Sequence, residues 1–136
     1  MDLSRPLEFL RTNGRAVLAT TRRDGSPQMS PILAAVDGAD RLLISSRETA
    51  IKTKNLRRDP RAWLCAISGG FFGEWYQISG DAEIISLPEA MDLLVEYYRV
   101  LSGEHPDWED YREAMRREQR CVIRVTPTQA GPNVSG

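Results

Sequence analysis

The chain has 136 residues, and its 18 Lys and Arg against 19 Asp and Glu give a formal net charge of −1 at pH 7. This length predicts a single domain that buries roughly two-thirds of its unfolded surface. No apolar run approaches the ~20 residues that a membrane span needs, and no signal-peptide segment opens the chain, so we expect a cytoplasmic protein. The acidic balance argues against nucleic-acid binding. A single histidine, His105, and two cysteines leave little from which to build a metal site, so we expect none.

The first part of the chain predicts a short helix and a β-hairpin. Residues 4–12 have apolar residues at helical spacing, and residues 15–21 and 27–36 form strand patterns on either side of a tight turn. Pro31 cannot donate to a sheet, so it marks an edge or a bulge in the second strand. The backbone around Ser30 would then face either a ligand or simply solvent.

A third strand, residues 41–45, leads into the segment 45–60, around which we expect the chain to be organised. Ser45 and Ser46 follow the strand pattern, and a helix is predicted to begin with Thr49 as its N-cap. A helix N-terminus offers free N–H groups and a positive dipole end, which suit a phosphate.

The same helix carries a concentrated positive charge. Residues 47–58 hold five cations against one acid, a local balance of +4 in a chain of net charge −1. These residues are Arg47, Lys52, Lys54, Arg57 and Arg58, with Glu48 as the acid. Composition alone gives equal weight to an anion site and to an ordinary solvated surface helix.

The second half predicts two strands, two helices and a last strand. Residues 62–67 should form a mostly buried strand, and residues 75–85 a long strand interrupted at Gly80 by a bulge or a barrel corner. Residues 86–89 fit a capping box before an apolar helical stripe, and an acidic helix follows. Residues 120–126 form the last strand. Cys65 and Cys121 lie in strand patterns, where we expect buried free thiols.

This order of elements is too antiparallel for a Rossmann fold and lacks a glycine fingerprint after its first strand. A closed, six-stranded barrel fits better. We expect one domain over residues 1–128 and a polar tail over residues 129–136.

Several segments together resemble a known superfamily. Ser45-Ser46-Arg47 followed by Lys52-x-x-Asn55-Leu56-x-x-Asp59-Pro60 resembles the flavin and deazaflavin reductases of the split-barrel superfamily that includes pyridoxamine 5′-phosphate oxidase. Residues 15–28 resemble the first hairpin of that family, and residues 103–108 resemble a loop of its short deazaflavin-binding members. The resemblance implies an α+β fold, a six-stranded antiparallel split β-barrel with flanking helices, and a homodimer with the cofactor at the subunit interface.

The resemblance also implies site residues, without assigning a catalytic one. The expected phosphate ligands are Lys52, Ser45, Ser46 and Arg47. The residues expected to line the ring are Gln28, Ser30 and Ile44, with Trp75 reaching it from the other subunit. The interface would be supplied by Trp63, Phe71, Phe72 and Trp75, although the two phenylalanines would also suit a cover over the ring.

The implied function is an F420H2-dependent reductase that transfers hydride from the deazaflavin to a small conjugated or heteroaromatic substrate. The preference for coenzyme F420 over FMN rests mostly on the resemblance to the short members of the superfamily, and Lys54, Arg57 and Arg58 agree with it because they would suit an anionic polyglutamate tail. An FMN-dependent oxidase or reductase is the alternative within the superfamily. A non-catalytic carrier of a flavin or tetrapyrrole also stays open, since no residue is an obligatory acid, base or nucleophile. Neither a nucleic acid nor a membrane is expected as a partner.

Overall fold

The computed structural model describes residues 2–67, 70 and 72–131. Along this part of the chain the elements are α1 (Ser4–Thr12), β1 (Arg15–Thr21), β2 (Pro27–Leu33), β3 (Ala35–Val36), β4 (Leu42–Arg47), α2 (Ile51–Arg58), β5 (Arg61–Ile67), β6 (Trp75–Ser86), α3 (Ala90–Ser102), α4 (Trp108–Arg117) and β7 (Arg120–Ala130).

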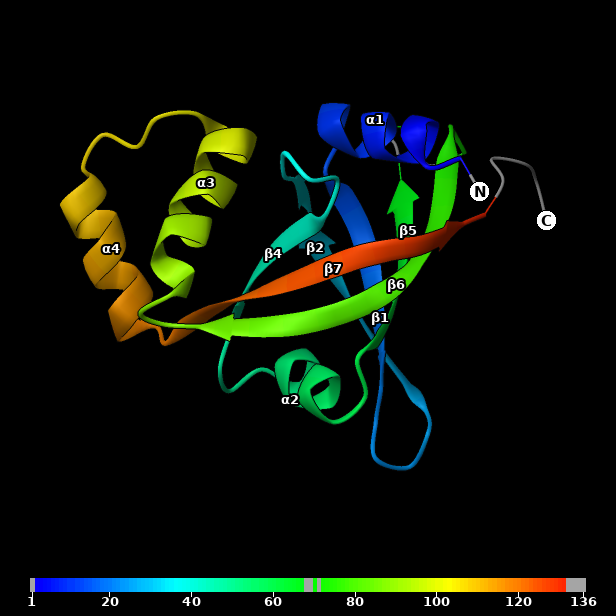
Figure 1. Cartoon of the computed structure of the whole chain (residues 1–136), viewed down its shortest axis with the longest axis horizontal. Helices are drawn as coiled ribbons and strands as arrows, with labels where there is room; N and C mark the ends of the chain where they lie inside the picture. Colours follow the sequence, from blue (N-terminus) through cyan, green and yellow to red (C-terminus); the bar gives the residue numbers. More distant parts are fainter. Residues whose placement is uncertain (1, 68–69, 71, 132–136) are drawn as a thin grey trace.

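The strands form one curled antiparallel sheet. Its order, within the described residues, is β2-β1-β5-β6-β7-β4-β3. β2 and β3 lie at opposite ends of this order, yet only Ala34 separates them in the chain. The sheet must therefore curl until its two edges approach each other. Figure 1 shows β6 and β7 crossing the front of this barrel, α1 and α2 at its two ends, and α3 and α4 together on one side. The α+β split-barrel class that we expected is confirmed.

The described sheet has seven strands rather than the expected six, because residues 27–36 form two strands. Between these two strands, the amide of Ala34 donates to the carbonyl oxygen of Gly14 (2.8 Å), directly before β1. A Cβ at Gly14 would lie 2.6 Å from the oxygen of Ala34, so this crossing needs glycine. The chain then passes to the far edge of the sheet, where β3 pairs with β4.

Two hydrophobic clusters share the central strands. One fills the barrel with residues such as Leu18, Leu64 and Ile78. The other lies beneath α3 and α4 and includes Leu43 and Leu94. Because β4 contributes to both clusters, it is buried on both faces. This burial explains why the strand begins with three consecutive apolar residues, Leu42, Leu43 and Ile44.

The two longest strands, β6 and β7, end later than the sequence predicted. The bulge predicted at Gly80 is confirmed by a shift in the β6–β7 register between Ser79 and Gly80. β7 continues to Ala130, and Gln129 pairs with Ser79, so the predicted end of this strand at residue 126 was too early. Residues 129 and 130 belong to the sheet and not to the expected tail, because β6 offers them a partner edge.

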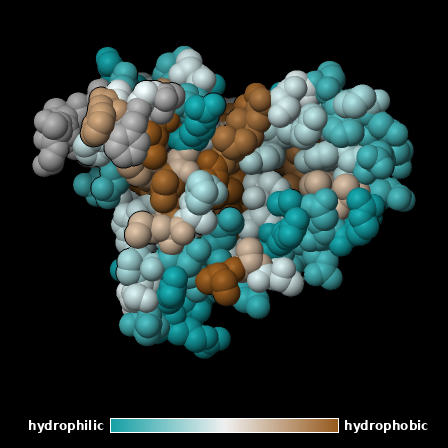
Figure 2. Space-filling model, turned by 180° about the vertical axis from the view of Figure 1, so that it is seen from behind, coloured by the Kyte–Doolittle hydropathy of each residue, from teal (hydrophilic) through white to brown (hydrophobic). Residues whose placement is uncertain are grey.

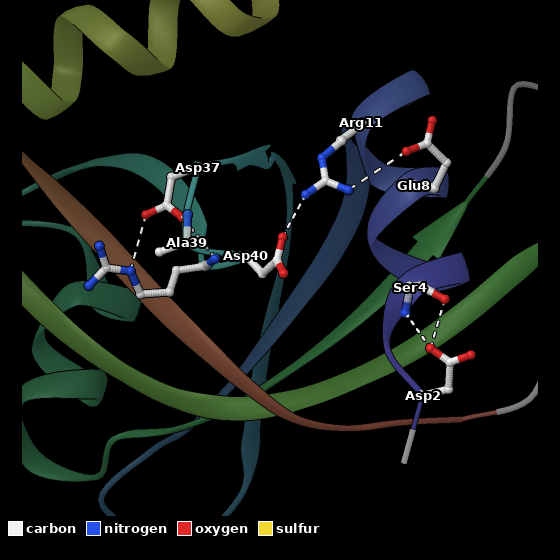
Figure 3. Close-up of polar contacts among 8 residues, drawn as sticks. Asp2, Ser4, Glu8, Arg11, Asp37, Ala39 and Asp40 are labelled. Atoms are coloured by element: carbon white, nitrogen blue, oxygen red, sulfur yellow. Dashed lines mark hydrogen bonds and ion pairs between the residues drawn. The ribbon is translucent and has the colours of Figure 1, made fainter.

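α1 and the β3–β4 turn hold each other at one end of the barrel. Figure 3 shows Arg11 of α1 reaching Asp40 of the turn, with the two side chains 2.7 Å apart. Asp37 fixes the turn itself, since its carboxylate accepts the amides of Ala39 (2.8 Å) and Arg41 (2.9 Å). The predicted first helix is confirmed and covers this end of the barrel.

Two local expectations were wrong. α3 begins at Ala90 with Glu89 as its N-cap, and Ser86 is the last residue of β6, so the predicted capping box does not form. The hydroxyl of Ser86 donates instead to Glu48 (2.7 Å). Cys121 is a buried free thiol as expected, but Cys65 is exposed, because β5 alternates between a buried and an outer face instead of being buried throughout. None of the helices in the described chain is long and apolar enough to cross a membrane.

Candidate functional site

The predicted anion site centres on the start of α2. This helix begins at Ile51 with Ala50 as its N-cap, so Thr49 is not the cap that we expected. The amide of Ala50 donates to the carbonyl oxygen of Arg47 (3.1 Å). This bond closes a turn, and the helix begins at the next residue, Ile51. No side chain of the described residues caps this helix. Its leading N–H groups therefore stay available to an external acceptor.

Lys52 lies in the first turn and is half-buried. Burial lowers the pKa of its ammonium group, and the positive charge of Arg120 lowers it further. In the part of the chain that the structure describes, the Lys52 ammonium has neither an ion pair nor a hydrogen bond. A partly desolvated cation without a carboxylate is stabilised by any anion that binds beside it.

The two serines before α2 point to opposite faces of β4. Ser45 pairs with Val122, whose side chain lies in the cluster beneath α3. Ser46 is buried on the other face, with its Oγ 2.8 Å from Oγ1 of Thr53. The single hydroxyl hydrogen of Thr53 goes to the carbonyl oxygen of Arg47 (2.7 Å), so Ser46 must donate to Thr53. The hydroxyl of Ser46 thus holds α2 in place and is not directed toward a ligand.

Three further predicted residues lie at different places in the fold, and Arg47 meets the start of α2 through its carbonyl oxygen, which accepts the amide of Ala50 (3.1 Å). Arg47 is exposed and reaches Glu118 at 3.6 Å. Ile44 is 1% exposed and packs in the barrel core. Trp75 begins β6, whereas Ser86, which contacts α2 through Arg57, ends it. These ends of β6 are roughly 36 Å apart along the strand. Within one chain, Trp75 therefore does not join the site.

A hydrogen-bonded chain links α2 to the first hairpin. Nδ2 of Asn55 donates to Oγ1 of Thr20 (3.1 Å), and Thr20 donates to Oε1 of Gln28 (3.3 Å). Arg58 donates to Oδ1 of Asn55 (3.1 Å) and fixes its amide. The carbonyl end of Gln28 is therefore occupied, and its NH2 group is left for another acceptor. Sequence reasoning gave no role to Thr20 or Asn55, although Asn55 stands in the motif that carries the resemblance and Thr20 is a polar residue that continues the buried alternation of β1.

Ser30 lies two residues along β2 from Gln28, on the same face of the strand. Its Oγ is buried and has no hydrogen-bond partner, which holds for no other buried side-chain N or O atom among the described residues. A buried hydroxyl without a partner costs free energy and is often found where a ligand supplies the bond. The structure thus brings together Gln28 and Ser30, and it connects Gln28 to α2.

A cationic cavity of about 790 Å³ opens between the β1–β2 turn and α2. Its lining residues are Arg22, Arg23, Asp24, Ile51, Lys54, Asn55, Arg57 and Arg58. Three cations of α2, namely Lys54, Arg57 and Arg58, thus line the same cavity, whereas Lys52 does not. Arg22 and Arg23 were missed, because they reach α2 only through the folding of the hairpin against the helix.

Two acids compensate part of this charge, Asp24 in the lining itself and Glu48 behind Arg57. Arg57 lies 2.6 Å from Glu48 and also donates to Ser86 (3.0 Å). Burial by itself raises the pKa of Glu48, but the hydrogen bonds from Ser86 and Arg57 outweigh it and hold that pKa below its usual value. The ionised Glu48 therefore neutralises Arg57, and Lys54 and Arg58 carry the charge that α2 presents to the cavity.

The chain is similar to known proteins both in sequence and in structure. The family model described as "Pyridoxamine 5'-phosphate oxidase" matches residues 6–132. A conserved hypothetical protein from Mycobacterium tuberculosis superposes with a TM-score of 0.74 at 23% identity, covering 100% of this chain and 92% of that one. A protein described as an F420 reductase gives a TM-score of 0.71 at 21% identity, covering 91% and 94%. An FMN-binding, pyridoxamine 5'-phosphate oxidase-related protein from Nostoc punctiforme gives 0.66 at 17% identity, covering 94% and 79%.

At sequence identities of 17–23%, similarity to these solved structures establishes the fold. The match of the family model to residues 6–132 establishes the family. The fold of this chain is therefore the one that these proteins share, with TM-scores of 0.74 and 0.71 for the first two. The chain belongs to the pyridoxamine 5′-phosphate oxidase family of split-barrel proteins.

Proposed function

We propose that this protein is an F420H2-dependent oxidoreductase that reduces a small conjugated or heteroaromatic substrate. The observation that carries the proposal is the half-buried ammonium group of Lys52, without an ion pair in the described chain, beside the uncapped first turn of α2. These groups fit a phosphate, which every flavin-type cofactor considered for this chain contains.

The residues of the chain would bind and orient the cofactor. Lys52 and the leading N–H groups of α2 hold the phosphate, and Ser46 supports them from below through Thr53. The NH2 group of Gln28 and the hydroxyl of Ser30 face the polar edge of the ring. The bound cofactor supplies the hydride. Removing the phosphate ligand should therefore change affinity while leaving the fold intact.

A homodimer forms part of the proposal. The outer face of β1, β2, β5 and β6 carries apolar side chains that one chain leaves uncovered, such as Met29, which is 62% exposed, and the partly exposed Trp63. Figure 2 shows hydrophobic residues gathered in the middle of the face seen from behind. A second copy would cover part of this face and bring its own Trp75 to the ring. Phe72 is 95% exposed, and Phe71 lies outside the described residues.

The cationic cavity favours F420 over FMN. Lys54 and Arg58 face the cavity without a carboxylate partner among the described residues, and Arg22 and Arg23 face them from the hairpin. An anionic polyglutamate tail suits this arrangement, whereas FMN ends at its phosphate and would leave the cavity unused. Similarity to the FMN-binding protein from Nostoc punctiforme makes an FMN-dependent oxidase or reductase the second candidate.

The two lysines of α2 give a direct test by calorimetric titration with each cofactor. Lys52→Ala should weaken binding of both F420 and FMN by about 1.5–3 kcal/mol, the cost of a lost charge-assisted hydrogen bond. Lys54→Ala is the matched control two residues away. It should leave FMN binding unchanged and weaken F420 binding by about 0.2–1 kcal/mol, an effect that added salt removes.

Different results would separate the alternatives. Equal affinities of the wild type and Lys52→Ala would contradict the phosphate site. Tighter binding of FMN than of F420, with oxygen-consuming turnover, would assign the chain to the FMN-dependent candidate. Tight binding without turnover of any reduced cofactor would indicate a carrier protein. A sedimentation species of only 15.3 kDa would exclude the dimer.

A further inference from the structure

A chain of side-chain hydrogen bonds runs from the cationic cavity at α2 to Gln28 of β2. Arg58, which lines the cavity, stands at its outer end, and two buried side chains connect Arg58 to Gln28. These are Asn55, which is 4% exposed, and Thr20, which is 0% exposed. Since every link joins a donor to an acceptor, the whole chain has a direction.

The direction of this chain is set at Arg58. A guanidinium group can only donate, so the atom of Asn55 that faces Arg58 (3.1 Å) must be the amide oxygen. The NH2 group of Asn55 then faces Thr20 and donates to its Oγ1 (3.1 Å). The single hydroxyl hydrogen of Thr20 is left for Oε1 of Gln28 (3.3 Å). A second bond from Arg58, to the carbonyl oxygen of Thr21 (2.6 Å), keeps the guanidinium group at this end of the chain.

Gln28 therefore presents its NH2 group, and not its carbonyl oxygen, to a ligand. This NH2 group makes no hydrogen bond with the residues that the structure describes. Ser30, on the same face of β2, has a buried hydroxyl without a partner, but a hydroxyl rotates and can either donate or accept. Of these two groups, Gln28 is the one fixed as a donor. It distinguishes a ligand edge that carries an acceptor from one that carries a donor.

We propose that Arg58, Asn55 and Thr20 are positioning residues that hold Gln28 as a donor, so that this site selects a ring edge with a hydrogen-bond acceptor. All three act through Gln28 and not on the ring itself. A carbonyl oxygen or an unprotonated ring nitrogen accepts from the NH2 group, whereas an N–H group would leave both donors unpaired and lose affinity. The identity of the ring rests on the proposed function, but the direction of the chain is a property of the protein without cofactor.

Asn55→Asp tests this direction at neutral pH, because a carboxylate accepts at both ends. One oxygen stays with Arg58 and the other accepts the hydrogen of Thr20, so Gln28 must turn over and donate its NH2 group to Thr20. In NMR spectra of the protein without cofactor, the NH2 protons of Gln28 should then exchange more slowly with water and give a stronger nuclear Overhauser effect to Thr20. FMN is the binding probe because it lacks the polyglutamate tail, and it should bind the variant roughly tenfold more weakly in calorimetric titration.

Two variants of Thr20 separate the hydroxyl from its packing. Thr20→Val keeps the buried volume but releases Gln28, so FMN affinity should fall roughly threefold. Thr20→Ser keeps the hydroxyl and should hold FMN affinity within about twofold of the wild type. Arg61→Ala is the charge control, because Arg61 lies three positions from Arg58 but pairs with Asp59. It should change neither the Gln28 signals nor FMN binding.

The proposal is overturned if Asn55→Asp leaves the Gln28 signals unchanged, if it binds FMN as tightly as the wild type, or if Thr20→Ser loses as much affinity as Thr20→Val. Should Asn55→Asp fail to fold, the comparison of the two Thr20 variants decides the proposal. A wild-type protein that binds neither FMN nor F420 at millimolar concentration would contradict the proposed function, and the NMR result would still decide the direction of the chain.

Discussion

The hydroxyl of Thr53 should be a main support of the α2 site, and Thr53→Val tests this. Thr53 is 0% exposed, so valine keeps the packing volume but loses both hydrogen bonds. It also leaves the hydroxyl of Ser46 and the carbonyl group of Arg47 without that partner in a buried place. A lost hydrogen bond costs about 0.5–1.5 kcal/mol, and a buried group left unsatisfied costs about 1–3 kcal/mol.

We therefore expect Thr53→Val to lower the free energy of unfolding by about 2–3 kcal/mol, measured by urea denaturation. Cofactor affinity should fall as well, because the first turn of α2 is no longer fixed to β4. The double variant Ser46→Ala/Thr53→Val should lose less than the sum of the single variants, since the orphaned hydroxyl is gone.

Thr49→Val is the matched control, because Thr49 does not cap α2. It should change the free energy of unfolding by less than about 0.5 kcal/mol. A Thr53→Val protein as stable as the wild type would refute the role given to this hydroxyl. Loss of stability in the Thr49→Val protein would show that our account of the α2 start is wrong.

Three other substitutions test separate parts of the structure. Ser30→Ala should raise the free energy of unfolding by about 1 kcal/mol and weaken cofactor binding, because it removes a buried hydroxyl without a partner; a less stable protein in urea denaturation would contradict this. Gly80→Ala should lower the free energy of unfolding by about 1–3 kcal/mol, because the new Cβ would overlap the carbonyl oxygen of Thr126. A melting temperature equal to that of the wild type would disprove the bulge geometry. Glu48→Gln should cost about 0.5–1.5 kcal/mol at neutral pH. The folded-state pKa of Glu48 is lowered, so its contribution is present above its unfolded pKa of about 4.3, and the two proteins should become equally stable as the pH falls through the folded value in a pH series of denaturation curves.

The sequence determined the features that depend on neighbouring residues. The period-two alternation of residues 15–21 predicted β1, and glycine in the turn predicted the hairpin, where Gly25 has a φ of 87°. Gly80 predicted the bulge for another reason, because a Cβ there would overlap the carbonyl oxygen of Thr126. The cations of α2 also stood out, because helical spacing collects them within two turns. All of these signals act over a few residues of chain.

Only the tertiary structure decided which groups meet at the site. Strand alternation places neighbouring residues such as Ser45 and Ser46 on opposite faces, but it cannot tell which face α2 covers, so it did not show that Ser46 bonds to Thr53. The contact of Thr20 with Asn55 joins residues 35 positions apart, and the cavity between Arg22 and α2 has the same origin. Such contacts depend on how the curled sheet brings its edges and helices together. Local propensity does not encode that arrangement, because it arises from the burial of the whole barrel core.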